Sequence, residues 1–160
     1  MPNWCSNKLK ISHIDENEVN VFVEKYREGV VIEHYLPTPK KPGGDIVDNW
    51  FDWRHANWGT KWDIGSEDNE RRGLHPTVVG NEASMTFNSA WSPPIGLYER
   101  LTVLGFNVRA LYWEPGHLFG GIWEDNNEEH IKYGHYTELP KEIIEVFNIE
   151  ELYEEWEEAQ

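Results

Sequence analysis

Residues 82–114 read EASMTFNSAWSPPIGLYERLTVLGFNVRALYWE, and this stretch is the most diagnostic part of the chain. Apolar and polar residues alternate over Glu82–Asn88, which predicts a strand with one buried face. Ser92 and the two prolines after it favour the start of a helix, whose apolar stripe ends at Gly105. A second strand is predicted from Asn107. A strand, a helix and another strand in direct succession are typical of an α+β domain.

The beginning of the chain has a similar arrangement. Cys5–His13 predicts an edge-compatible strand, and we expect Trp4 and Cys5 to begin it as buried residues. A helix follows, with Asp15 as its cap, Glu18 completing a capping box and Gly29 as its stop. The apolar stripe of this helix consists of Val19, Phe22, Val23 and Tyr26. Later in the chain, the strands Asn107–Glu114 and Phe119–Glu124 are predicted to form a hairpin around Pro115-Gly116.

These elements predict an α+β fold with a ferredoxin-like antiparallel sheet and two helices on one face, plus a C-terminal acidic helical extension. We expect the ferredoxin-like domain at 1–135, with a Trp-rich insertion near 45–80, and a Glu-rich helical tail at 136–160 packed on the domain. Within the insertion, 48–63 suggests a short helix and then a strand, and 66–80 suggests a surface excursion. The last helix is expected to begin at Asn148, capped with Glu151, and to bury Ile149, Leu152, Tyr153 and Trp156.

Composition excludes several classes of protein. The formal net charge is −15, which disfavours non-specific binding to nucleic acid or to an anionic membrane. The candidates for a local basic patch are Lys8 with Lys10, Lys40 with Lys41, and Arg71 with Arg72. No apolar run is long enough for a membrane helix, the N-terminus lacks the regions of a signal peptide, and Cys5 is the single cysteine. We therefore expect a cytoplasmic protein.

Four short strings carry a resemblance to a known family. They are M-P-N-W-C-S-N (1–7), N-W-G-T-K-W-D (57–63), F-N-S-A-W-S-P-P (87–94) and Y-W-E-P-G (112–116). In this order and spacing, residues 1–125 resemble the YubB-like or Api-like ferredoxin-like domain proteins of conjugative plasmids and bacteriophages. The resemblance implies a ferredoxin-like fold and a mobile-element origin. It implies no catalytic residues, because the family has no established function, and a role in counter-defence is our functional hypothesis.

The strings also supply a candidate binding site. Nine tryptophans are present, and an indole N–H needs a partner wherever the ring is buried. One interpretation is a pocket in which Trp58, Trp62 or Trp91 stacks on a planar, nucleotide-like ligand, with Lys61 meeting a phosphate. Directional polar groups would come from Asn57, Thr60, Asp63 and Ser92. The alternative interpretation is a structural corner in which Gly59 adopts a positive φ and the tryptophans fill the core.

Two other functions stay open at the level of sequence. His75-Pro76-Thr77 and His135-Tyr136-Thr137 resemble the paired motifs of two-histidine phosphoesterases, in which one His acts as general base and the other as general acid. The glutamates of the last helix suggest an acidic interaction protein that imitates nucleic acid. No metal-ligand spacing is evident, and we predict no cofactor. We prefer a non-catalytic accessory protein of a phage or plasmid, which binds a host protein or a small nucleotide-like ligand.

Overall fold

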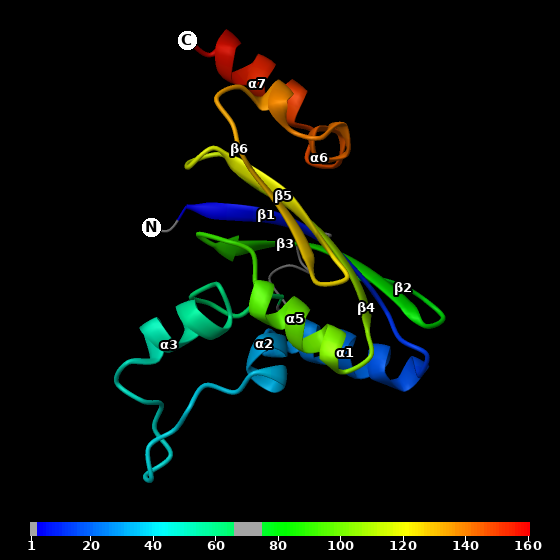
Figure 1. Cartoon of the computed structure of the whole chain (residues 1–160), viewed down its shortest axis with the longest axis vertical. Helices are drawn as coiled ribbons and strands as arrows, with labels where there is room; N and C mark the ends of the chain where they lie inside the picture. Colours follow the sequence, from blue (N-terminus) through cyan, green and yellow to red (C-terminus); the bar gives the residue numbers. More distant parts are fainter. Residues whose placement is uncertain (1–2, 66–74) are drawn as a thin grey trace.

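The structure is a computed structural model, and it describes residues 3–65 and 75–160. Its centre is a six-stranded antiparallel sheet with the strand order β2-β3-β1-β4-β5-β6 (Figure 1). The strands are β1 (Trp4–Ser12), β2 (Thr77–Val79), β3 (Glu82–Ala90), β4 (Asn107–Glu114), β5 (Phe119–Glu124) and β6 (Asn127–Lys132). The first four strands have the spatial order of a ferredoxin-like sheet, and the β5–β6 hairpin widens it. The fold is α+β, as the sequence predicts.

Helices cover both faces of this sheet unequally. On one face lie α1 (Glu16–Glu28), α2 (Val31–Tyr35) and α5 (Ile95–Val103), while α3 (Trp50–Asn57) lies beyond the ends of the strands (Figure 1). The C-terminal segments lie on the other side, near β5 and β6: a 3₁₀ turn (Tyr136–Glu138), α6 (Lys141–Val146) and α7 (Ile149–Glu158). Within the described residues, no helix is both long and apolar enough to span a membrane.

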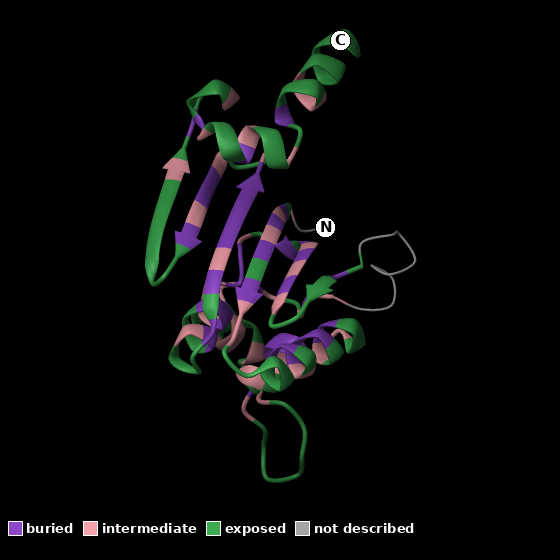
Figure 2. Ribbon diagram, turned by 90° about the vertical axis from the view of Figure 1, so that its right-hand side faces the viewer, coloured by how far each residue is buried: buried purple, intermediate pink, exposed green. Residues whose placement is uncertain are grey.

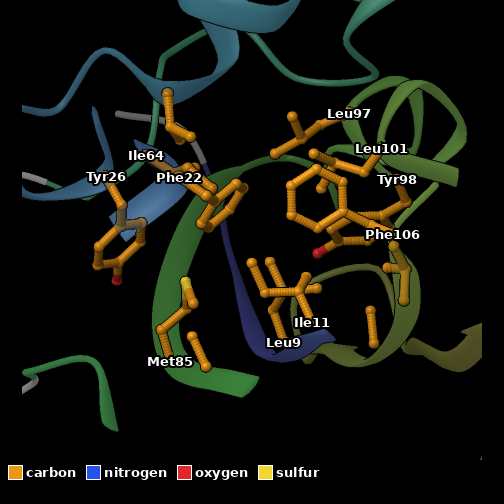
Figure 3. Close-up of a cluster of buried hydrophobic side chains, with 14 of the residues drawn as sticks. Leu9, Ile11, Phe22, Tyr26, Ile64, Met85, Leu97, Tyr98, Leu101 and Phe106 are labelled. Atoms are coloured by element: carbon orange, nitrogen blue, oxygen red, sulfur yellow. The ribbon is translucent and has the colours of Figure 1, made fainter. Parts of the chain in front are cut away.

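The main core lies between the sheet and the α1/α5 layer. Alternate residues of β1, β3 and β4 point into it, and the predicted stripe of α1 is buried against them. Figure 3 shows this cluster, in which Leu9, Ile11 and Met85 from the sheet meet Phe22 of α1 and Leu101 of α5. The two periodicities, 2 for strands and 3.6 for helices, therefore predicted the same apolar layer from opposite sides.

The other face of the sheet is only partly covered. A second apolar cluster joins Leu111 and Trp113 of β4 to Ile143 and Ile149 of the C-terminal helices. Figure 2 shows these helices above one end of the sheet, while along β1 and β3 buried residues alternate with half-buried or exposed ones. The boundary between a 1–135 domain and a 136–160 tail stays a prediction, although these contacts attach the tail to the sheet.

Several local expectations were wrong. The first strand is central rather than an edge, because β1 pairs with both β3 and β4. Trp4 is 46% exposed because its side chain falls on the open face. Residues 58–63 form turns, not a strand, since Gly59 has φ 84°. Part of the predicted surface excursion is the edge strand β2, whereas 66–74 lie outside the described residues.

The predicted helix caps were right in part. The Asp15 carboxylate accepts from the Asn17 N–H at 2.9 Å, as expected for a cap. The Asp15 N–H donates to His13 Nδ1 at 2.9 Å instead of to Glu18, so the second bond of the capping box is made by a residue before the helix. Gly29 ends α1 with φ 75°, as predicted.

Of the other two predicted caps, Ser92 was wrong, and Asn148 holds the N-cap position and pairs with Glu151 without capping the backbone. Ser92 does not cap α5, because its hydroxyl donates to the Gly59 carbonyl and Pro94 occupies the N-cap position. Asn148 precedes α7 in a left-handed conformation, and its side-chain amide donates to the Glu151 carboxylate rather than capping the backbone. In both cases the polar side chain donates a hydrogen bond to an oxygen elsewhere and leaves the free N–H groups of the helix without a side-chain cap.

Candidate functional site

Trp58 fixes the corner of the molecule where α3 ends. Its side chain is completely buried, and its indole N–H donates to the Leu36 carbonyl oxygen at 2.8 Å. The Trp53 ring contacts it edge-on, with the centroids 6.5 Å apart. A buried indole with its N–H satisfied belongs to the core. Trp58 therefore holds α3 against the loop after α2.

Three more of the predicted site residues bond to the backbone of their own corner. The Thr60 hydroxyl is buried and donates to the Ala90 carbonyl at 2.9 Å. The Ser92 hydroxyl donates to Gly59, and the Asn57 amide donates to Trp53 at 2.8 Å. The Thr60 and Ser92 bonds tie the turn after α3 to the end of β3, whereas the Asn57 bond lies within α3.

Asp63 joins the same corner to α2. Its carboxylate accepts from the Ile32 and Glu33 N–H groups, each at 2.9 Å, and from the Ile64 N–H at 2.8 Å. Ile32 and Glu33 lie in the first turn of α2, where N–H groups have no partner within the helix. Burial raises the pKa of the Asp63 carboxyl above its usual range, while these backbone donors act in the opposite direction. Asp63 thus caps a helix from outside its own sequence.

The remaining residues of the corner leave aromatic surface exposed. Phe51 is 45% exposed and Trp62 is 42% exposed. The Trp50 and Trp62 ring centroids are 6.0 Å apart, and the Lys61 Nζ lies 4.6 Å from the Trp62 centroid and 5.5 Å from that of Phe51. We call Trp50, Phe51, Lys61 and Trp62 the aromatic corner. An ammonium at this distance from an indole ring makes a cation–π interaction.

Arg54 supports the aromatic corner from within. Its guanidinium carbon lies 4.4 Å from the Trp58 ring centroid and 5.1 Å from that of Trp50. Its Nε donates to the Thr38 hydroxyl at 3.1 Å, and a terminal nitrogen lies 3.8 Å from the Glu33 carboxylate. A guanidinium with all these partners is held in one orientation, so the rings that rest on it are held as well.

Trp91 lies in a different environment from Trp62. It has φ 71°, which is rare for a bulky residue, and it is 42% exposed. Its ring neighbour is His117, with the centroids 6.1 Å apart. His117 is itself held by the buried Glu114, whose carboxylate lies 2.8 Å from the His117 Nδ1. The eight predicted residues therefore do not line one pocket around stacked tryptophans.

The four strings quoted above nevertheless meet at one end of the sheet. The buried Asn7 amide donates to the Ser89 hydroxyl at 2.8 Å, and that hydroxyl donates to the Ser92 carbonyl at 2.7 Å. The Trp91 N–H donates to the Asn3 carbonyl at 2.8 Å, and the Asn3 side-chain amide lies 3.1 Å from His117 Nδ1. The polar residues of the strings thus supply a hydrogen-bonded frame for this end of the fold.

The two histidines of the enzyme hypothesis are not brought together. His75 precedes the edge strand β2, and His135 follows the opposite edge strand β6. Five inter-strand spacings of about 4.8 Å separate these edges, so the side chains lie on the order of 20 Å apart. His135 caps the 3₁₀ turn, and its Nδ1 lies 2.9 Å from the Thr137 hydroxyl. One histidine cannot act as base and the other as acid on a single phosphodiester at this distance.

The C-terminal helix uses its apolar stripe within the chain. Ile149 is buried, and Leu152 and Tyr153 pack beside it in the second cluster. The Trp156 ring stacks on Trp113, with the centroids 6.4 Å apart. The glutamate-rich face that remains is exposed. Among the described residues, no group of three or more His, Cys, Asp or Glu side chains is arranged to hold a metal ion.

Comparison with known proteins adds a likeness of fold. No family model matches the chain, and no curated protein matches it by sequence. Among solved structures, the fold is similar to that of protein api92 from Yersinia pseudotuberculosis, of the DUF1281 family. That match has a TM-score of 0.44 and 10% sequence identity, and it covers 84% of this chain and 99% of the other. The relation is therefore distant and lies at the level of the fold.

The sequence prediction missed two members of the aromatic corner. Trp50 and Phe51 lie one turn of helix before Arg54 and present their rings beside Lys61 and Trp62. Their position in the most Trp-rich part of the chain was the available signal. Sequence spacing does not predict that they lie beside Lys61 and Trp62, because one pair is on a helix and the other is in the turn that follows it.

Proposed function

We propose that this chain is a non-catalytic binding protein that recognises a protein partner through the aromatic corner. The main observation in support is the position of the Lys61 ammonium. Its Nζ lies 4.6 Å from the centroid of the exposed Trp62 ring and 5.5 Å from that of the exposed Phe51 ring. Trp, Tyr and Arg are enriched among the residues that contribute most to protein–protein binding energy, and the exposed Trp62 ring is a side chain of this kind. Isolated exposed apolar residues need no explanation, but three neighbouring aromatic residues, two of them with the Lys61 ammonium above the ring, do.

The construction of the corner favours binding to a folded partner. Trp58, Thr60 and Asp63 fix its backbone through hydrogen bonds to three other segments. Arg54 holds the rings from beneath. A surface that is already ordered loses little conformational entropy when a partner binds. Rigid aromatic anchors therefore give affinity at low cost.

Charge indicates which partner surface fits. The chain has a net charge of −15, yet the aromatic corner presents Lys61. A partner that offers a carboxylate beside an apolar pocket would satisfy the Lys61 ammonium and the rings together. Lys61 would contribute little to long-range steering of the partner, because the chain as a whole has a net charge of −15.

The biological setting follows from the four strings and their resemblance to plasmid and phage proteins. On that basis the partner is a host protein, and the role is counter-defence. A small nucleotide-like ligand is the alternative occupant, with its base on Trp62 and its phosphate on Lys61. Both occupants need the same residues, so the experiment must separate them by ligand rather than by variant.

The test compares captured host proteins between matched variants. The full chain is immobilised and exposed to bacterial lysate, and any captured protein is purified and titrated against the wild type, Phe51→Ala/Trp62→Ala and Trp4→Ala. Trp4 is the control because it is exposed to the same extent but lies on the sheet. We expect the double variant to weaken binding at least about 30-fold, which is 2 kcal/mol, and Trp4→Ala to leave it unchanged. Equal binding by all three proteins contradicts the proposal.

A thermal-shift series on the same proteins separates the nucleotide alternative. Mono-, di- and cyclic nucleotides are added to the wild type and to the double variant. A rise in melting temperature that the double variant abolishes would favour the small ligand over the protein partner. Circular dichroism of each variant confirms that α3 and the sheet have formed.

A further inference from the structure

The open face of the sheet contains a cavity that the aromatic corner does not use. It has a volume of about 380 Å³ and lies over β2, β3, β1 and β4, with α6 at its side. Its lining residues are Lys8, Lys10, Thr77, Val79, Glu82, Ser84, Arg109, Leu111, Glu142 and Val146. This volume is within the range of cavities that hold small organic ligands.

Strand register explains why polar groups converge there. Ser84 of β3 pairs with Thr77 of β2 on one side and with Lys10 of β1 on the other, and Lys10 pairs with Arg109 of β4. These four side chains therefore form one row across the sheet, with neighbouring Cβ atoms about 5 Å apart. Lys8 lies two residues before Lys10 on the same face, about 7 Å along the strand. Two ammonium groups and two hydroxyls thus lie on neighbouring positions of the same face and line the same cavity.

The lining of this cavity holds three cationic side chains and two carboxylates, and Arg109 also bonds to a third carboxylate, that of Glu124, at 3.2 Å. Lys10 Nζ lies 2.9 Å from the Glu82 carboxylate, and Arg109 makes two bonds to the Glu142 carboxylate at 2.6 and 2.7 Å. Lys8 is half-buried and, within the described part of the chain, has no carboxylate partner. An unpaired ammonium that is partly removed from water gains more from a bound anion than an exposed one does.

We propose that this cavity binds a small organic phosphate monoester. The phosphate lies between Lys8 and Lys10 and accepts hydrogen bonds from the Ser84 and Thr77 hydroxyls, since a dianion with three terminal oxygens can satisfy all four donors. Val79 and Val146 offer an apolar surface to the organic part. Glu82 and Glu142 do not repel the anion strongly, because Lys10 and Arg109 neutralise them.

The test is an isothermal titration of the full chain with phenyl phosphate, inorganic phosphate and phenol. The site variant is Lys8→Met, which keeps the length of the side chain and removes its charge. The control is Lys132→Met, because Lys132 is exposed at the far edge of the same sheet and its loss changes the net charge equally. We expect phenyl phosphate to bind more tightly than inorganic phosphate, phenol not to bind, and Lys8→Met to weaken phenyl phosphate binding about tenfold.

Several results overturn the proposal. They are no binding of phenyl phosphate to the wild type at millimolar concentration, equal weakening by Lys132→Met, and unchanged binding by Lys8→Met. A single-stranded oligonucleotide tests whether the phosphate belongs to a polymer. If the oligonucleotide binds and phenyl phosphate does not, the small-molecule proposal is also contradicted. Phe51→Ala/Trp62→Ala should retain phenyl phosphate binding. The experiment therefore tests this site independently of the proposed function of the aromatic corner.

Discussion

Gly96 at the start of α5 lies directly against the Asn57 carbonyl at the end of α3. A Cβ atom built on Gly96 would be 1.7 Å from the Asn57 oxygen, and the Gly96 N–H donates to the Trp58 carbonyl at 3.1 Å. The approach of two backbones, rather than a turn, requires glycine here. It also means that the aromatic corner is positioned by a helix from the other half of the chain.

Gly96→Ala should therefore destabilise the protein by about 3 kcal/mol, because backbone at Asn57 must move away from α5. Urea unfolding followed by circular dichroism measures the change in the free energy of unfolding. Gly43→Ala is the control, since a Cβ there meets nothing within 4 Å, and it should change stability by less than about 0.5 kcal/mol. An unchanged urea midpoint for Gly96→Ala would refute the close approach.

Asp63→Ala should cost about 2 kcal/mol of stability, because three backbone N–H groups lose their acceptor, two of them in the first turn of α2. Asp63→Asn keeps one side-chain oxygen and should lose less. Thermal melts of both variants, with Asp48→Ala as an exposed control, measure the difference. Equal losses in the alanine and asparagine variants would show that the charge, and not the number of acceptors, determines the effect.

The sequence predicted the elements that bury one face against the main core. Leu9 and Ile11 in β1, and Phe22 in α1, repeat with the periods of a strand and a helix because each contacts the same apolar layer. β2 and β6 were missed for the same reason. Their residues are almost all exposed, since each is an edge strand with one neighbour, and an exposed strand has no apolar alternation to detect.

The candidate site could be predicted only in part, because tryptophan occurs both in the core and on the surface. Trp58 and Trp62 lie four residues apart in one string, yet one is buried and the other is exposed. The difference between them comes from a tertiary contact. The Trp58 indole N–H donates to the Leu36 carbonyl, which lies 22 residues earlier in the chain. The open-face cavity was hidden likewise, since Ser84 and Lys10 become neighbours only through strand register.

Arg109 makes the attachment of α6 to the sheet sensitive to pH. The Arg109 guanidinium lowers the pKa of the Glu142 carboxyl below its usual range, so the ionised form is favoured in the folded state. The Glu142 contribution to stability is therefore present above the unfolded pKa of about 4.3 and is lost as pH falls through the lower folded value. Amide exchange is intrinsically slower at low pH, so the measurement is the protection factor, which corrects for the intrinsic rate. The protection factors of the α6 amides should fall at pH 3 relative to pH 6.

Glu142→Gln removes this titration and should reduce the dependence of the α6 protection factors on pH. Glu145→Gln is the control, because that carboxylate pairs with Lys141 on the same exposed helix rather than with the sheet. If Glu142→Gln has the same pH profile as the wild type, the Arg109 bond does not attach the helix.

Ile149 connects α7 to the second apolar cluster. It is fully buried at the first position of the helix and packs in the cluster with Trp113 and Ile143. Ile149→Ala should destabilise the protein by about 2–4 kcal/mol through lost burial and a residual cavity. Ile14→Ala, at a residue 95% exposed, should have almost no effect. Urea unfolding measures both, and equal midpoints would mean that the tail is not part of the cooperative unit.

Cys5 should be unreactive in the folded protein although it lies only four residues from the N-terminus. Burial, together with the nearby Glu114 carboxylate, raises the pKa of the Cys5 thiol well above its usual range, so the thiolate is not populated at neutral pH. Labelling with an aromatic disulfide reagent at pH 8 should follow unfolding: none in buffer, and one thiol per chain in 6 M guanidinium. Because β1 is the central strand, local fraying cannot expose Cys5 without breaking its pairing with Ser89. Gly96→Ala should therefore increase the labelling rate only as far as it increases the unfolded fraction, and rapid labelling of the wild type would contradict the burial of this strand.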